Sequence, residues 1–306
     1  MAGLLASLQG AVAQGVLWGI MVLGVYITFR LMDIADMTVD GSFALGACIC
    51  ATLVVNKGVS PLIALFVAML AGMIAGSVTG ILHTVFEIPA ILAGILTQIS
   101  LWSVNLRIMG GKSNIPLLKV DTVISKVSDG FALTQAQASM VVGIVIVSAV
   151  ILFLYWFFGT EIGSAMRATG NNEDMVRALG INTKMTKLLA LMVSNSFVAL
   201  AGALVCQSQK YGDVGIGTGA IVIGLAAIVI GEVLLGRLTP FYWKLISVVL
   251  GSVIYFVIRA LVLRMGLNAN DMKLLSAIIV ALALCIPVAL AKYRLKKEYS
   301  EGGDEE

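Results

Sequence analysis

The chain has 306 residues, of which 59% are hydrophobic and only 12% are charged, and its mean hydropathy is +1.02. Soluble domains carry about a quarter charged residues, so this composition excludes an ordinary soluble protein. The formal net charge of +3 is small and provides no concentrated basic face of the kind that nucleic-acid binding requires. We therefore expect an all-α polytopic membrane protein, with no nucleic-acid partner, whose solvent is the lipid bilayer.

The apolar segments predict the number of membrane spans. The first fifteen residues contain no Lys or Arg, so the first apolar segment is expected to be a retained span and not a cleaved signal peptide. A span needs about 20 mostly apolar residues. About nine segments (8–10) meet this condition, near residues 14–31, 38–55, 61–84, 89–108, 138–159, 186–206, 217–236, 242–263 and 271–292. We expect one transmembrane domain over residues 1–292 and a charged tail over residues 293–306.

Two of the nine segments are irregular, and both are expected to be broken or re-entrant helices. The second begins in "DIADMTVDGSFALGA" (33–47), and the seventh follows "GDVGIGTGAIVIGLA" (212–226). Backbone freed from helical pairing survives in a membrane only against protein or a water-filled cavity, and paired Gly-interrupted segments are typical of a transport path. The alternative is that these glycines only allow helices to pack closely. The candidate path residues are Asp40, Gly41, Ser42, Gly217, Thr218 and Gly219.

Three carboxylates precede or begin the second segment. Asp33 and Asp36 are expected in the headgroup layer beside Arg30, and Asp40 is expected to be the deepest. An intramembrane carboxylate is a functional candidate by default, and Asp40 is the residue we assign to meeting an ammonium group of the cargo. Its alternative role is to cap the helix that follows it, because Asp is a favourable N-cap residue.

The basic residues beside the spans predict the orientation. The cluster Lys292, Arg294, Lys296 and Lys297 in the tail favours a cytoplasmic C-terminus. With nine spans, the loop over residues 160–187 lies on the same side and the N-terminus lies outside. The long connection over residues 109–137 is then external, either as a solvated loop or as a landing surface for an extracytoplasmic partner.

The stretch "GTEIGSAMRATGNNEDMVRALGIN" (159–182) carries unusual charge for this chain and predicts two short helices. Thr160 is expected to cap the first helix, Gly170 and Asn171 to break it, and Asn171 or Asn172 to cap the second. On the second helix, Met175, Val176 and Leu179 are expected to share one face. Such an elbow is suited to docking against a partner. The alternative is an ordinary loop or a pair of helices on the membrane surface.

Other candidate chemistry is sparse, and we predict no catalytic, metal or cofactor site. His83 is the only histidine, with Glu87 four residues on, and a structural role is expected for it. Glu232 is expected to pair locally with Arg237. The four cysteines lie in apolar runs and are expected to act as small hydrophobes. The chain has no P-loop motif for ATP.

The elbow resembles the coupling loop of ATP-binding cassette permeases of the branched-chain amino acid type, and the resemblance extends over roughly residues 10–292. The matching residues are Gly163, Ala165, Met166, Arg167, Ala168, Asn172, Ala178, Gly180, Ile181 and Asn182. "RLMDIADMTVDGSFALGA" (30–47) and "GLNANDMKLLSAIIVALAL" (266–284) resemble a subgroup described as tryptophan/tyrosine or amino-acid-like importers. Where the branched-chain branch has an Asn-Phe-Ala-His-Gly-like motif, this chain has "IADMTVDGSF", which puts a branched-chain substrate in doubt.

The resemblance implies a permease homodimer in a bacterial cytoplasmic membrane that imports a small amino-acid-like solute. ATP would be bound by separate cytoplasmic ATPase subunits, and a solute-binding protein would deliver the cargo outside. The residues implied in ATPase coupling are Gly163, Met166, Arg167, Asn172, Arg177, Gly180 and Asn182. The alternatives are an ion-coupled secondary transporter, a permease of the same fold for a nucleoside or sugar, and an intramembrane enzyme. An enzyme would need catalytic groups that converge within the membrane, and one histidine and few polar groups are too few for this.

Overall fold

The computed structural model describes residues 2–118, 120–235 and 240–265, and beyond these only residues 274, 277, 278, 281, 282 and 285. Most of the expected ninth span (271–292) and all of the expected tail (293–306) therefore lie outside the described residues. In the described part, the chain is almost wholly helical.

Seven helices are long and apolar enough to cross a membrane, which supports a polytopic membrane protein. They are α1 (Ala2–Tyr26), which continues as a π-helical turn η1 (Ile27–Leu31), α2 (Val39–Asn56), α3 (Pro61–Thr84), α4 (Ala90–Ile108), α6 (Gln135–Gly159), α9 (Thr183–Gln209) and α11 (Phe241–Arg264). A shorter apolar helix, α10 (Ala220–Leu235), coincides with the seventh expected segment. Eight of the nine expected segments are thus helical, and the exact number of spans stays a prediction.

Three helices form the centre of the bundle. Of the most apolar stretch of each helix, 83% is buried in α1, 67% in α2 and 72% in α9, against 39% in α3, 28% in α4 and 33% in α6. Apolar side chains left exposed on a membrane helix face lipid at no cost. The outer helices α3, α4 and α6 therefore have the composition of lipid-facing spans, and α1, α2 and α9 position the polar residues.

The connection between α1 and α2 is not helical, so the three aspartates do not share a helix face. Asp33 has a left-handed backbone, with φ of 54°, and is exposed. Asp36 is instead only 3% exposed. Its carboxylate accepts hydrogen bonds from Asn195 Nδ2 of α9 at 2.7 Å and from the Thr38 backbone N–H at 2.9 Å. Asp36 is thus enclosed by protein because an amide inside α9 supplies a partner, and the expectation that Asp40 lies deepest in the membrane stays a prediction.

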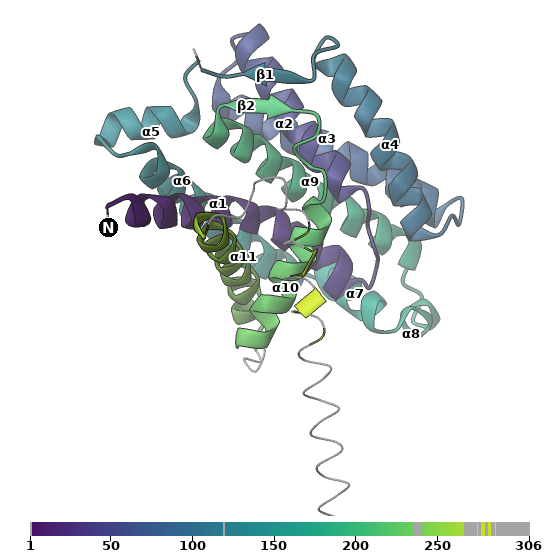
Figure 1. Cartoon of the computed structure of the whole chain (residues 1–306). Coiled ribbons are helices and arrows are strands. Elements are labelled where there is room, and N and C mark those ends of the chain that lie inside the picture. The colour runs from purple at the N-terminus through teal and green to yellow at the C-terminus, as the bar shows by residue number, and fades with distance from the viewer. Residues whose placement is uncertain are drawn as a thin grey trace, which may run out of the picture.

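The two ends of the molecule differ in character (Figure 1). At one end, β1 (Asn114–Pro116) and β2 (Tyr211–Asp213) form a short antiparallel ribbon in which Ile115 pairs with Gly212. At the other end lie the short helices α7 (Glu161–Asn171) and α8 (Glu173–Ala178). We call these the ribbon end and the elbow end. The ribbon, which an all-α prediction did not include, ties the 109–137 connection, with its helix α5 (Val123–Phe131), to the segment before α10.

Candidate transport path and coupling elbow

The predicted elbow is present as two capped helices. The Thr160 hydroxyl accepts from the Gly163 backbone N–H at 3.3 Å and caps α7. The Asn172 side-chain oxygen accepts from the Met175 N–H at 3.0 Å and caps α8. Because Asn172 leaves the helical conformation, with φ of −157°, the break falls there and not at Gly170–Asn171. Gly180 ends the elbow with φ of +83°, a conformation that favours glycine.

The elbow is attached to the helix bundle by close contacts and ion pairs. Gly170 lies directly against the Leu31 carbonyl, where a side chain would overlap the backbone of η1. Glu173 accepts hydrogen bonds from Lys187 Nζ of α9 at 2.6 Å and from Arg177 at 2.9 Å. The hydrogen bond from Lys187 is the largest influence that holds the pKa of Glu173 below its ordinary value. The elbow is therefore in direct contact with both η1 and α9.

The residues implied in ATPase coupling divide into two groups. Gly163 and Met166 are buried and pack inward, so they support the shape of the elbow. The other five side chains or backbones lie on the surface: Arg167, Asn172, Arg177, Gly180 and Asn182.

The second elbow helix exposes apolar side chains. Met175 is 50% exposed and Leu179 is 70% exposed, whereas Val176 is fully buried. Of the three residues expected on one face, Val176 therefore packs against the bundle, while Met175 and Leu179 are exposed. The outward pair leaves an apolar surface at the tip of the elbow, as a docking helix requires.

The two irregular segments meet each other, as a shared path would require. The Asp40 carboxylate accepts from the backbone N–H groups of Gly219 at 2.8 Å and Ile221 at 2.9 Å, one on each oxygen. Asp40 therefore caps α10 across the structure and does not cap its own helix, whose N-cap is Thr38. Gly217 lies so close to the Asp40 carbonyl that no side chain fits between them. All six candidate path residues come from this junction.

A narrow polar gap lies beside the junction. It has a volume of about 30 Å³ and is lined by Asp40, Gly41, Asn105 and Thr218, among others. The hydroxyl of Ser42 and the side-chain oxygen of Asn105 are buried and have no hydrogen-bond partner in the described structure. A gap of this size has room for about one water molecule. In this conformation the junction is closed to any larger solute.

A cavity of about 670 Å³ opens at the ribbon end of α10. Thr218 and Gly219 of the junction line its floor, and Trp18 of α1, Asp213 of β2 and Arg259 of α11 are among its walls. Its volume lies in the range of small-molecule sites. Of the predicted path residues, Thr218 and Gly219 therefore line this cavity, whereas Asp40, Gly41 and Thr218 line the narrow gap.

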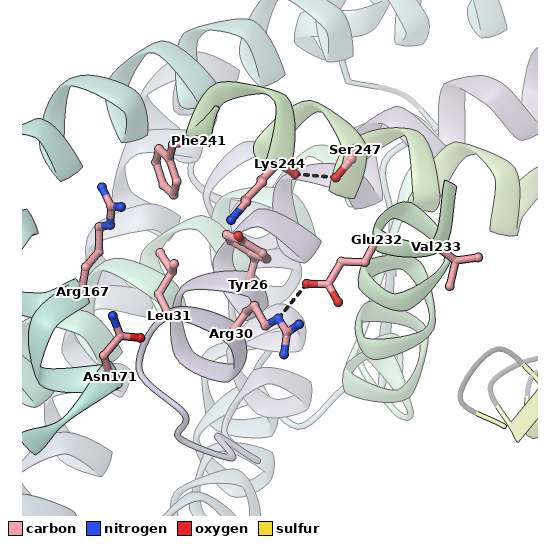
Figure 2. A pocket seen from close by; sticks show the side chains of 10 residues that line it. All are labelled: Tyr26, Arg30, Leu31, Arg167, Asn171, Glu232, Val233, Phe241, Lys244 and Ser247. Atoms are coloured by element: carbon pink, nitrogen blue, oxygen red, sulfur yellow. Dashed lines mark hydrogen bonds and ion pairs between the residues drawn. The ribbon is translucent and has the colours of Figure 1, made fainter. Parts of the chain in front are cut away.

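A second cavity, of about 620 Å³, lies at the elbow end of α10. Figure 2 shows Arg167 and Asn171 of α7 on one side and Glu232 and Val233 of α10 on the other, with Tyr26, Arg30 and Lys244 between them. Arg30 Nε donates to Glu232 at 2.7 Å. Arg167 lies over the Phe241 ring at 5.1 Å, so it connects the elbow to α11.

The remaining sequence candidates have structural partners. His83 Nδ1 lies 2.9 Å from the Ile88 carbonyl, while Glu87 pairs with Lys184 at 3.0 Å, so the two form no relay. Glu232 pairs with Arg30; Arg237 lies outside the described residues. Cys48, Cys50 and Cys206 are buried and free. No group of three or more His, Cys, Asp or Glu side chains in the described part is placed to hold a metal ion.

Comparison with known proteins shows the family of the chain. A family model described as the permease component of branched-chain amino acid transport systems matches residues 7–286. The chain belongs to this permease family. The permease is 38% identical, over 90% of both chains, to a tyrosine transport system permease protein of Clostridioides difficile (strain R20291). It is 30% identical to an uncharacterised protein of Rickettsia prowazekii (strain Madrid E), over 90% of this chain and 95% of that one. No solved structure matches it.

Sequence reasoning missed three polar contacts of the permease. The Asp36–Asn195, Arg30–Glu232 and Asp40–α10 contacts each join residues more than 150 positions apart. The signal for the first was present, because an Asn in the apolar run of α9 needs a buried partner. The other two depend on which helices are neighbours, which hydropathy does not encode.

Proposed function

We propose that this chain is the membrane-spanning subunit of an ATP-driven importer, and that ATP is bound and hydrolysed by separate ATPase subunits docked on the elbow. The observation that carries this proposal is the elbow itself, a capped helix pair with exposed Met175 and Leu179 that is attached to η1 and α9. A secondary transporter has no need of such a surface. The subunit itself transports and does not catalyse, and it needs no cofactor of its own.

We propose an amino acid or amino-acid-like cargo. The relative from Clostridioides difficile is named for tyrosine transport, and the chain departs from the branched-chain pattern at "IADMTVDGSF". Both observations favour an aromatic or related amino acid over a branched-chain one. A nucleoside or a sugar is the alternative cargo for the same fold.

The proposed path runs along α10. It begins in the ribbon-end cavity and passes the junction of Asp40, Gly41, Ser42, Gly217, Thr218 and Gly219. Because both Asp40 oxygens already accept α10 amides, we assign Asp40 to holding the start of α10 in place of binding the cargo's ammonium group. Opening the junction then requires α2 and α10 to separate.

The proposed protein partners are assigned to the elbow end and the ribbon end of the permease. We propose that a second copy of the permease completes the path, that the ATPase subunits dock at the elbow end, and that a solute-binding protein docks at the ribbon end on the 109–137 connection. This places the elbow in the cytoplasm of a bacterium and the ribbon outside.

The energy source tests the class of transporter. Uptake of labelled tyrosine is measured in cells that express the permease with its ATPase subunits. We expect uptake to stop when ATP is depleted and to persist when an ionophore collapses the ion gradients. The reverse pattern would assign the chain to the ion-coupled transporters.

Thiol labelling tests the orientation. In a cysteine-free variant, Ser113→Cys at the ribbon end should react with an impermeant thiol reagent in intact cells, and Asn171→Cys on the elbow should react only after the cells are opened. Both positions are exposed. Labelling of Asn171→Cys from outside would reverse the assignment of the two ends.

A further inference from the structure

The elbow-end cavity carries more positive charge than its own carboxylate can neutralise. Three basic side chains line it, Arg30, Arg167 and Lys244, against one described carboxylate, Glu232. Glu232 is already paired with Arg30. Among the described residues, neither Arg167 nor Lys244 has a carboxylate within ion-pair distance. A bound anion would neutralise these two cations and accept charge-assisted hydrogen bonds from them.

The donor geometry favours an oxyanion with several oxygens. Arg30 uses Nε for Glu232, and this leaves its two terminal amino groups for another acceptor, since a guanidinium offers five N–H donors. Arg167 lies over the Phe241 ring and makes no side-chain hydrogen bond to another described residue. The Tyr26 hydroxyl and the Asn171 amide are further polar groups on the walls (Figure 2). A phosphate group is a suitable acceptor for basic and polar side chains that come from three helical elements around one cavity.

Aromatic side chains place the cavity at the depth of lipid headgroups. Tyr155 and Trp156, near the end of α6, are 54% and 65% exposed, and Tyr242 and Trp243, at the start of α11, are 41% and 38% exposed. Tyr155 contacts Tyr242 with ring centroids 6.3 Å apart. Exposed Trp and Tyr at helix ends gather in the headgroup layer. Phe241 and Lys244, which line the cavity, belong to the same first turns of α11.

An apolar surface lies beside the cavity at the end of α10. Val233 and Leu234 of α10, directly after Glu232, are 55% and 56% exposed, and Val233 lines the cavity itself. An acyl chain can lie along such a surface while its headgroup occupies the cavity. This continuity favours a phospholipid over a free phosphate compound. Basic pockets between transmembrane helices are known to take anionic headgroups.

We propose that this cavity binds the phosphate group of an anionic phospholipid. The lipid contacts Arg30 of η1, Arg167 of the elbow and Lys244 of α11, and so holds together the three elements that must move when the elbow moves. The permease then depends on anionic lipid for the connection between its elbow and its bundle. This inference requires the membrane location of the chain and does not require its transport activity.

Lipid binding to the purified permease tests the proposal without ATPase subunits or ATP. Native mass spectrometry in detergent would compare retention of phosphatidylglycerol with that of phosphatidylcholine, which carries no net charge. We expect a preference for phosphatidylglycerol. Arg167→Gln and Lys244→Gln should each weaken it about fivefold, the contribution of one basic group near an anionic surface. Lys244→Arg should retain binding. Both side chains are exposed, so neither change removes a core contact.

Lys184→Gln is the matched control, because Lys184 lies at the same end, pairs with Glu87 and does not line the cavity. Equal retention of the two lipids, wild-type binding by the double variant Arg167→Gln/Lys244→Gln, or equal weakening by the control would overturn the proposal.

Competition with soluble anions identifies the source of the phosphate. Displacement of the lipid by millimolar inorganic phosphate would support the same phosphate chemistry with a soluble source. If free tyrosine displaces the lipid and loses its own binding in the same variants, the cavity belongs to the cargo and the proposal is wrong. Because binding is measured on the permease alone, a failed transport assay leaves this result standing.

Discussion

The two ends of α10 differ in whether the charged side chains around them have partners within the protein. At its start, both oxygens of the Asp40 carboxylate accept hydrogen bonds from the backbone N–H groups of Gly219 and Ile221. The junction is closed around a gap of about 30 Å³. At its end, Glu232 is paired, but Arg167 and Lys244 face a cavity of about 620 Å³ without a carboxylate partner among the described residues. A charged group whose hydrogen bonds are all made within the protein stabilises the fold, whereas a charged group without a protein partner is available to bind a ligand.

The largest effect should come from filling the closed junction. Gly217→Leu places a side chain where the Asp40 carbonyl lies, so α2 and α10 must separate. Overpacking of this kind costs about 3 kcal/mol. We expect a lowered thermal unfolding midpoint in detergent and loss of uptake. Gly130→Leu on α5 is the control, because nothing lies within 4 Å of the added carbon there. An unchanged unfolding midpoint for Gly217→Leu would mean that the junction is not closed.

The Asp40 cap should give a graded effect. Asp40→Ala removes both acceptors and should destabilise the permease by about 2 kcal/mol. Asp40→Asn keeps one acceptor oxygen and should cost about half as much. Thermal unfolding of the two variants and uptake by each give the comparison. If Asn is as stable as wild type but takes up no cargo, the charge of Asp40 acts on the cargo and the capping role is secondary.

The elbow's attachment should show a small, pH-dependent effect. The Lys187 hydrogen bond lowers the pKa of Glu173, so this carboxylate stabilises the fold above the ordinary pKa of Glu. The stabilisation is lost as the pH falls below that value, through the lowered pKa of the folded state. At pH 6.5, Glu173→Gln should reduce hydrogen-exchange protection of α8 about twofold to fivefold. At pH 3.5 the difference from wild type should shrink. Equal protection at pH 6.5 would show that the ion pair contributes nothing.

How far the sequence predicts this molecule depends on the range of the interaction. Hydropathy predicted eight segments that are helical in the structure, seven of them long and apolar enough to cross a membrane. The capping residues Thr160 and Asn171 or Asn172 predicted the elbow helices. Both signals are local properties of the sequence. The α9 partner of Asp36 and the α10 partners of Asp40 lie more than 150 residues away, and these contacts depend on which helices become neighbours. The sequence offered a cap on Asp40's own helix as the alternative to cargo binding, whereas the carboxylate accepts from the first N–H groups of α10.

The ribbon shows a different limit. Residues 114–116 and 211–213 are too short to show strand periodicity, and each is stable only because helices bring the two together. A pairing of three residues per strand cannot be recognised from composition. It nevertheless decides what the 109–137 connection touches, which is the chain leading into α10.

Docking of an ATPase on the elbow is tested most directly by a charge placed on its exposed tip. Leu179→Asp changes a side chain that is 70% exposed and supports no core, and Leu118→Asp makes the same change to a residue that is 75% exposed at the ribbon end. With the ATPase subunits co-expressed, Leu179→Asp should lower both their co-purification and ATP-dependent uptake by about tenfold or more, as expected for loss of an apolar anchor. Leu118→Asp should leave co-purification unchanged. Wild-type co-purification and uptake in Leu179→Asp would contradict a coupling role for the elbow.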